Sequence, residues 1–113
     1  MAKRTRSINA DIKEYIRLLR DSYNVYAIIL FGSHAQGRAG DYSDIDLAVF
    51  SDDFGKNPFQ EMKGLLKLRR KINPDIEPLP FSKQVFFEHD KAEFVSEILS
   101  RGKIIYKEGQ TYI

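Results

Sequence analysis

Cysteine and tryptophan are both absent from this 113-residue chain. Without cysteine there is no disulfide, no thiol nucleophile and no cysteine-based zinc site. No apolar run approaches the roughly 20 residues that span a bilayer, and no signal peptide is visible. An excess of charge of one sign is also lacking, because 16 Asp and Glu nearly balance 18 Lys and Arg. The sequence therefore predicts a cytoplasmic protein with no membrane segment and no strong nucleic-acid signal.

The chain does contain enough apolar material for one modest core. Hydrophobic residues make up 42% of it, and eight Phe and six Tyr supply the large side chains. A chain of this length is typical of one small domain, so we expect a single domain over residues 1–113.

The most informative stretch is residues 31–50, FGSHAQGRAGDYSDIDLAVF. The apolar run 25–31 before it predicts a buried strand at the centre of a sheet. Gly32 then allows a tight turn, and Ser33 starts a predicted short helix over 33–36. A helix N-terminus offers free N–H groups and a partial positive charge, which suit a phosphate.

Ten residues separate Ser33 from two carboxylates in the predicted strand 44–50. Asp44 and Asp46 are two positions apart, so they share one face of the strand, about 6.6 Å apart along the chain. Two such charges repel each other by about 4 kcal/mol at 4 Å and an effective dielectric constant near 20. A divalent cation converts that repulsion into binding, because hard cations prefer carboxylate oxygens. A phosphate site beside a metal site indicates chemistry on a nucleoside triphosphate.

Two common phosphate and metal motifs do not fit this stretch. Gly32 and Gly37 have the spacing of a Walker A loop, but Arg38-Ala39 stands where Lys-Ser/Thr is needed. Ala48 and Val49 occupy positions where an EF-hand needs a ligand and a glycine. The structural alternative, an acidic turn before an ordinary strand, stays open.

A third carboxylate is expected from residues 75–80, which follow a predicted helix over 59–72. Three prolines, Pro74, Pro78 and Pro80, predict a strand that is short or lies at an edge. Asp75 and Glu77 share a face there. Glu77 is better placed because its neighbours are apolar, while Asp75 remains the alternative, as does a surface acid pair capping a turn.

The remaining elements are predicted from periodicity and caps. Asn9 is expected to cap a first helix that ends near residues 21–24. A short helical turn within 81–90, a helix over 94–101 stopped by Gly102, a strand over 103–106 and a tail over 109–113 complete the chain. Arg38 either reaches a phosphate tail or is solvated, and both interpretations stay open.

Gly32-Ser33, a ten-residue spacing, and Asp44-Ile45-Asp46 with a later carboxylate together resemble the minimal nucleotidyltransferases of the DNA polymerase beta superfamily, antitoxin type. The resemblance covers nearly the whole chain. It implies an α/β fold, with a small mixed β-sheet and helices packed on it. It also implies Mg²⁺-dependent transfer of a nucleoside monophosphate from a triphosphate to an acceptor hydroxyl.

The resemblance further implies roles for individual residues. Gly32 and Ser33 would hold the β and γ phosphates, and Asp44 and Asp46 would bind two Mg²⁺ ions about 3.5–4 Å apart. Glu77 would complete the metal site or act as the base.

Phosphate binding differs from the family pattern at one position of the motif. Many relatives have arginine where this chain has Gln36, and Arg38 is the expected substitute for that phosphate contact.

The resemblance also points to partners. The substrate would be ATP or another nucleoside triphosphate. The acceptor would lie on a separate helical protein of the HEPN type, a toxin that the transferase silences by adding AMP, and self-association into a homodimer is the other way to complete a cleft. Two further hypotheses stay open: an antitoxin that blocks its partner by contact alone, and a transferase core acting on a small molecule or RNA.

Overall fold

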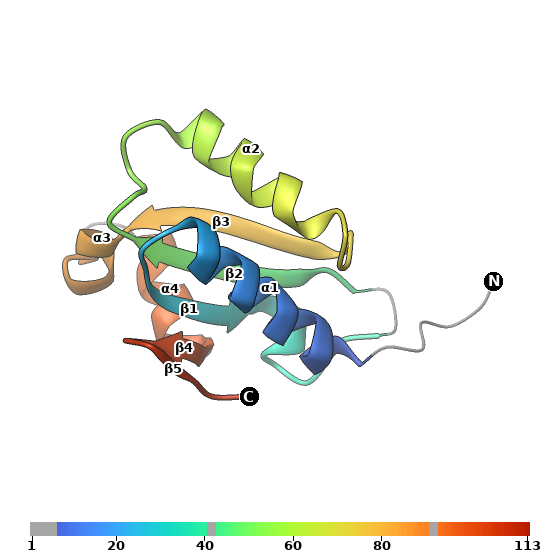
Figure 1. The fold of residues 1–113 in the computed structure, drawn as a ribbon. Coiled ribbons are helices and arrows are strands. Elements are labelled where there is room, and N and C mark those ends of the chain that lie inside the picture. The colour runs from blue at the N-terminus through green and yellow to red at the C-terminus, as the bar shows by residue number, and fades with distance from the viewer. Residues whose placement is uncertain (1–6, 41–42, 91–92) are drawn as a thin grey trace.

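A five-stranded mixed sheet organises the structure, a computed structural model that describes residues 7–40, 43–90 and 93–113 (Figure 1). The strand order is β3-β2-β1-β4-β5. Strand β2 pairs in parallel with β3, and the other neighbours are antiparallel. The strands are β1 (Val25–Phe31), β2 (Ile45–Ser51), β3 (Ile76–Ser82), β4 (Lys103–Lys107) and β5 (Gln110–Thr111). The expected mixed sheet and the central position of residues 25–31 are confirmed.

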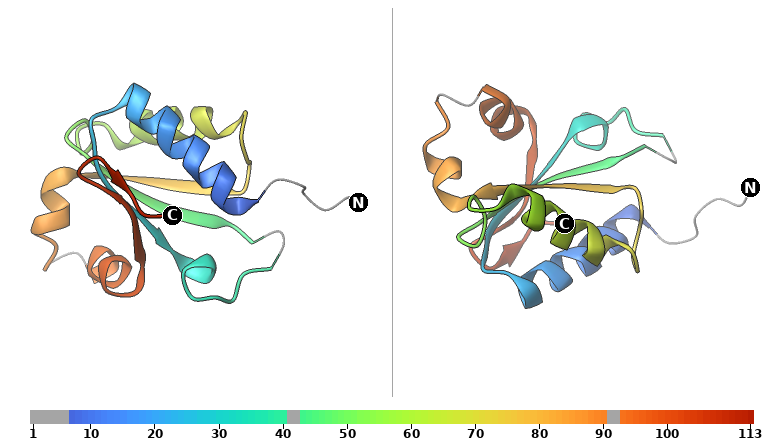
Figure 2. Two further views of the ribbon diagram at one scale, coloured as in Figure 1. Left: turned by 60° about the horizontal axis from the view of Figure 1, so that its bottom comes forward. Right: turned by 90° about the horizontal axis from the view of Figure 1, so that it is seen from above.

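Helices cover both faces of the sheet. Helices α1 and α2 pack on one face, and α3 and α4 pack on the other (Figure 2). Their bounds are α1 (Ile8–Ser22), the 3₁₀ turn η1 (Gly32–His34), α2 (Pro58–Arg69), α3 (Lys83–Phe87) and α4 (Glu93–Arg101). None of the helices in the described ranges is long and apolar enough to cross a membrane.

Strand β2 shows how the two cores alternate. Ile45, Leu47 and Val49 are buried in the core under α1 and α2. Ala48 and Phe50 are buried in the core under α3 and α4. Because side chains alternate along a strand, Asp46 lies on the same face as Ala48. The predicted acidic site therefore opens on the α3 and α4 face.

Strand β3 lies at an edge of the sheet, as the prolines predicted, but it is not short. It pairs with β2 over seven residues, from Ile45–Ile76 to Ser51–Ser82. Pro78 and Pro80 lack N–H groups, and an edge strand tolerates this on its outer side.

Several predicted elements need correction. Ser7, not Asn9, caps α1, since its hydroxyl accepts from the Ala10 N–H at 3.1 Å. Residues 33–36 form no α-helix, because the turn begins at Gly32 and consists of a single 3₁₀ turn. The helix predicted over 59–72 ends at Arg69. Beyond it the Ile72 N–H donates to Arg69 O, three residues back, which is the tighter pattern of a turn.

The predicted tail over 109–113 also contains a short strand. Glu108 and Gly109 have positive φ angles of 50° and 85°, so they reverse the chain. Strand β5 then pairs back on β4, with Lys107 opposite Gln110.

Candidate active site

Three side chains form a row across one end of the sheet. Asp46 is the second residue of β2, and its antiparallel partner is Phe31, the last residue of β1. Its parallel partner is Glu77, the second residue of β3. Paired residues of neighbouring strands project to the same face, so Phe31, Asp46 and Glu77 lie side by side. Asp75 lies before β3, and its carbonyl accepts from the Ile45 N–H at 2.8 Å.

Gly32 packs its backbone directly against Asp46. Its φ angle is +74°, in the left-handed region. A β-carbon added at Gly32 would overlap Oδ2 of Asp46. Glycine therefore serves two needs here, the backbone conformation and the close approach of the loop to the carboxylate.

The loop after Gly32 is held by its own hydrogen bonds. The Ala35 and Gln36 N–H groups both donate to Gly32 O at 3.1 Å, and the Arg38 N–H donates to Ser33 O at 3.0 Å. The two halves of the motif are also joined, since Nε2 of His34 lies 3.3 Å from the carbonyl oxygen of Ser43.

Negative charge is concentrated around Asp46. Burial raises the pKa of the Asp46 carboxyl, and the negative charges of Asp44 and Glu77 raise it further, while His34 acts in the opposite direction. Asp44 itself is exposed and directly precedes β2, which spans Ile45–Ser51, so the strand predicted over 44–50 is corrected by one residue and Asp44 lies outside it. The predicted acids therefore lie close enough for each of the other two to oppose ionisation of Asp46.

Glu77 faces a cation from α2. Nη1 of Arg69 lies 3.5 Å from Oε1 of Glu77. The same nitrogen donates to Ile76 O at 2.7 Å and to Pro74 O at 3.0 Å. The arginine thus holds the start of β3 and attracts the Glu77 carboxylate.

A metal site can be assessed from these carboxylates. In the described residues, no three His, Cys, Asp or Glu side chains are close enough together to hold a metal ion as placed. The donors are nevertheless the right kind, since Asp44, Asp46 and Glu77 offer only oxygen atoms, which hard divalent cations prefer. Their mutual repulsion at Asp46 is what a cation would relieve.

A pocket of about 160 Å³ lies beside this row, between the loop and α4. The lining combines the loop with one face of the helix: Phe31, Gly32, Gln36, Arg38, Phe94, Glu97, Ile98 and Arg101. Two predicted nucleotide-binding residues, Gly32 and Arg38, thus line one pocket, whereas Ser33 is not among the lining residues. Sequence analysis missed Phe94 and Arg101, because the helix over 94–101 shows only a packing pattern and a C-terminal stop.

The family model of the polymerase beta nucleotidyltransferases matches residues 13–111 of this chain. The chain belongs to that family. The matched residues include the whole row of Phe31, Asp46 and Glu77 and the pocket beside it.

Two proteins of Methanocaldococcus jannaschii are similar in sequence, and both carry the provisional name protein adenylyltransferase. One is 34% identical over 98 residues, which cover 84% of this chain and 94% of that protein. The other is 39% identical over 67 residues, or 56% of this chain and 67% of that protein. The chain is therefore a nucleotidyltransferase and an enzyme.

Solved structures of nucleotidyltransferases share the fold. A provisionally named nucleotidyltransferase of Sulfolobus solfataricus superposes with a TM-score of 0.66 at 17% identity, covering 100% of this chain and 97% of that one. A toxin–antitoxin complex with AMP-PNP gives a TM-score of 0.59 at 24% identity over 90% of this chain and 75% of that one. The MntA–HepT toxin–antitoxin complex gives 0.54 at 20% identity, over 88% and 73%. At these identities the likeness establishes the α/β fold alone.

Proposed function

We propose that this nucleotidyltransferase moves AMP from ATP to a hydroxyl group on a partner protein, in a Mg²⁺-dependent reaction. The observation that carries the proposal is the row of Asp46 and Glu77 beside Gly32, with Asp44 next to it. Acids gathered against a glycine loop have a use in phosphate chemistry, whereas a plain binding surface has no need of them. The names of the two M. jannaschii relatives agree with transfer to a protein.

The carboxylates and the glycine loop have different tasks in this proposal. Asp44, Asp46 and Glu77 would hold two Mg²⁺ ions. When bound, these ions supply charge neutralisation on the phosphate oxygens and orientation of the reacting groups. Gly32 and Ser33, joined by Arg38, receive the β and γ phosphates.

The reaction balances without any further reactant. The acceptor oxygen forms a bond to the α phosphorus, the bond from that phosphorus to the bridging oxygen of the β phosphate breaks, and pyrophosphate leaves. The acceptor proton passes to a carboxylate, for which Glu77 is the candidate. Its side chain is 48% exposed and lies on the edge strand, where a large acceptor can approach.

We infer that the acceptor is a helical toxin of the HEPN type and that the transfer silences it. The toxin–antitoxin complexes that share the fold support this assignment, and one of them was crystallised with an ATP analogue. ATP and such a partner meet in the cytoplasm, where we place the protein.

Label transfer tests the activity. The purified protein, Mg²⁺ and a lysate of its native cells are incubated with ATP labelled at either the α or the γ phosphate. The Asp44→Asn/Asp46→Asn variant serves as the inactive protein. Asp52→Asn/Asp53→Asn is its matched control, because it removes two exposed acids just beyond the opposite end of β2.

We expect a protein band labelled from the α phosphate only, present with the wild type and with the control. A γ label would indicate phosphoryl transfer instead and would contradict the proposal. Label in RNA or a small molecule would move the acceptor to that class. Neutralisation of a toxin that survives Asp44→Asn/Asp46→Asn would favour inhibition by contact.

A further inference from the structure

Arg101 brings a second guanidinium group to the pocket that Arg38 lines. Arg101 is the last residue of α4, and Arg38 belongs to the loop that follows Gly32. Both residues are exposed, and within the described part of the chain neither forms an ion pair. Two unpaired cations from different elements therefore line one small pocket next to Asp46.

The position of Arg101 is fixed by contacts at the end of α4. The Gln36 side-chain amide donates to the Arg101 carbonyl oxygen at 3.2 Å, a contact between residues 65 positions apart. Gly102 follows, and its N–H donates to Ile98 O at 2.8 Å. A β-carbon at Gly102 would overlap Ile29 and Ile98, so the helix end lies tightly on β1. The loop and the helix end are thus one unit.

The charge of the pocket favours an anion. The lining has two arginines and one acid, Glu97, which precedes Arg101 by one helical turn. One guanidinium group donates two parallel hydrogen bonds to a pair of phosphate oxygens. Two guanidinium groups can therefore bind two neighbouring phosphates, so the pocket suits a polyphosphate better than an anion with a single charge.

We propose that Arg101 and Arg38 together clamp the β and γ phosphates of the nucleoside triphosphate, so that α4 is part of the nucleotide site. The clamp rests on the proposed function, because it takes its ligand from that reaction. It adds a binding residue that lies more than fifty residues beyond the glycine loop and the acid pair. Gln36 is then a positioning residue, since it ties the helix end to the loop.

A structural role for Arg101 makes a different prediction. A cation in the last turn of a helix stabilises it through the helix dipole, whichever nucleotide is bound. Loss of that role would lower the melting temperature without discriminating between nucleotides. The clamp, by contrast, acts only on phosphates that AMP does not carry.

The test compares binding of AMP and of a non-hydrolysable ATP analogue by calorimetry, in Mg²⁺, for five proteins. These are the wild type, Arg101→Ala, Arg101→Lys, Glu97→Gln and Arg70→Ala. Arg70 is the matched control, because it is an exposed arginine just after α2, on the other side of the sheet. Thermal unfolding of each variant checks that it folds.

We expect Arg101→Ala to weaken binding of the triphosphate analogue roughly tenfold or more, which is the range of a hydrogen bond to a charged group. The affinity for AMP should be unchanged. The affinity of Arg101→Lys for the analogue should lie between those of the wild type and Arg101→Ala. Glu97→Gln should bind the analogue more tightly than the wild type does. The clamp proposal is wrong if Arg101→Ala binds the analogue as tightly as the wild type and Arg70→Ala do. It is also wrong if Arg101→Ala loses affinity for AMP and for the analogue equally. In both cases the proposed function stands. A wild type that binds no triphosphate overturns both.

Discussion

Oδ2 of Asp46 occupies the space that a β-carbon at position 32 would need. Gly32→Ala should therefore displace the carboxylate and also place alanine at a φ of +74°. The backbone term alone costs roughly 1–2 kcal/mol. We expect a lower free energy of unfolding and, because Asp46 moves, a loss of transferase activity.

Gly37→Ala separates the two causes. Gly37 has nearly the same φ, +71°, but a β-carbon there meets nothing within 4 Å. It should therefore show the backbone cost in a denaturant titration while keeping most of the activity. Equal activity of Gly32→Ala and Gly37→Ala would contradict the contact between Gly32 and Asp46.

Asp46→Asn should make the protein more stable and less active. Burial and the charges of Asp44 and Glu77 raise the pKa of Asp46, so the ionised carboxylate is unfavourable in the fold. Removing its charge should raise the melting temperature at neutral pH when no divalent cation is present. Activity should fall at least about a hundredfold, because a bound metal ion contributes several kcal/mol.

Mg²⁺ should make the wild type more stable than Asp46→Asn, the reverse of the order expected without it. A cation that binds the folded state stabilises it by mass action, so the wild type should gain melting temperature in Mg²⁺ and Asp46→Asn should gain little. Asp52→Asn, beyond the far end of β2, should respond to Mg²⁺ as the wild type does. If Asp46→Asn melts lower than the wild type without Mg²⁺, the electrostatic account is wrong.

The part of the site that is local in sequence could be predicted from the sequence. The apolar run 25–31, Gly32 and the alternation around Asp46 lie within about twenty residues, so spacing alone places them. Glu77 was favoured over Asp75 because of its apolar neighbours, and the structure puts Glu77 in register with Asp46. Its catalytic role remains a prediction.

What the sequence could not show depends on long-range packing. The parallel register of β2 and β3 and the contact between Gln36 and Arg101 join segments that are far apart, and no local pattern records them. The prediction of the N-cap of α1 was wrong for a different reason. Ser7 and Asn9 are both good caps, and packing of the partly buried Ile8 against the core extends the helix to the earlier one.

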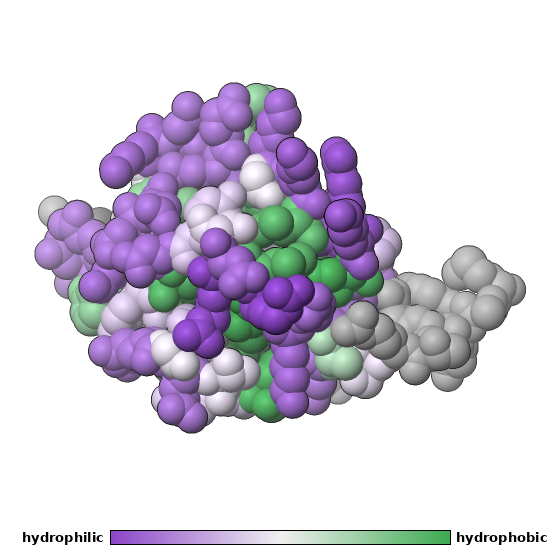
Figure 3. Space-filling model, in the orientation of Figure 1, coloured by the Kyte–Doolittle hydropathy of each residue, from purple (hydrophilic) through white to green (hydrophobic). Residues whose placement is uncertain are grey.

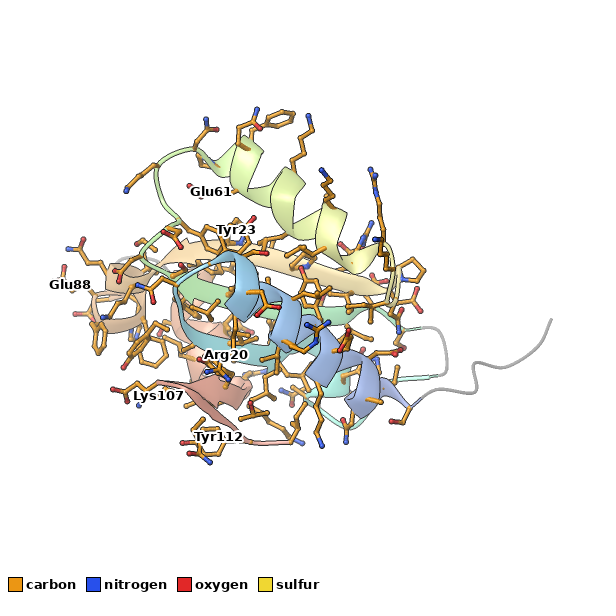
Figure 4. All side chains as sticks on the ribbon, in the orientation of Figure 1. Arg20, Tyr23, Glu61, Glu88, Lys107 and Tyr112 are labelled. Carbon is orange, nitrogen blue, oxygen red and sulfur yellow. The ribbon has the colours of Figure 1, made fainter. Side chains whose placement is uncertain are left out.

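Glu61 should make stability depend on pH through the loop before α2. Burial raises the pKa of its carboxyl, but hydrogen bonds from the N–H groups of Asn57, Gly55 and Lys56, 2.9–3.0 Å long, outweigh burial and lower the pKa overall. Figure 4 shows Glu61 beneath the first part of α2. Figure 3 shows the hydrophilic outer surface of this helix. The three hydrogen bonds to Glu61 are themselves exposed, so solvent weakens them.

A lowered pKa stabilises the folded state above the unfolded value, near 4.3, and the gain disappears as the pH falls through the folded value. Glu61→Gln should therefore cost about 1 kcal/mol at pH 7, after discounting for solvent, and nothing in stronger acid. Urea titrations at a series of pH values measure this. Glu88→Gln is the control, because it removes an exposed carboxylate on the turn after α3 that accepts from the Gln84 side chain. An equal pH trend in both variants would refute the role of the loop.

Arg69 should control activity through Glu77 without touching the nucleotide. Nη1 of Arg69 reaches Ile76 O, Pro74 O and the Glu77 carboxylate, so it fixes the start of β3 and the direction of that side chain. Arg69→Met keeps most of the aliphatic stem but removes all three contacts. We expect a loss of about 1–3 kcal/mol in unfolding free energy.

We also expect Arg69→Met to lower kcat or metal affinity roughly tenfold to a hundredfold, as loss of a side chain that orients a metal ligand does. Arg69→Lys should recover part of both, since an ammonium group can still reach one or two of the acceptors. A purely structural arginine would lower the melting temperature and leave the Mg²⁺ dependence of kcat unchanged. A shifted Mg²⁺ requirement in Arg69→Met, restored toward wild type by Arg69→Lys, would instead show that α2 aims the third carboxylate.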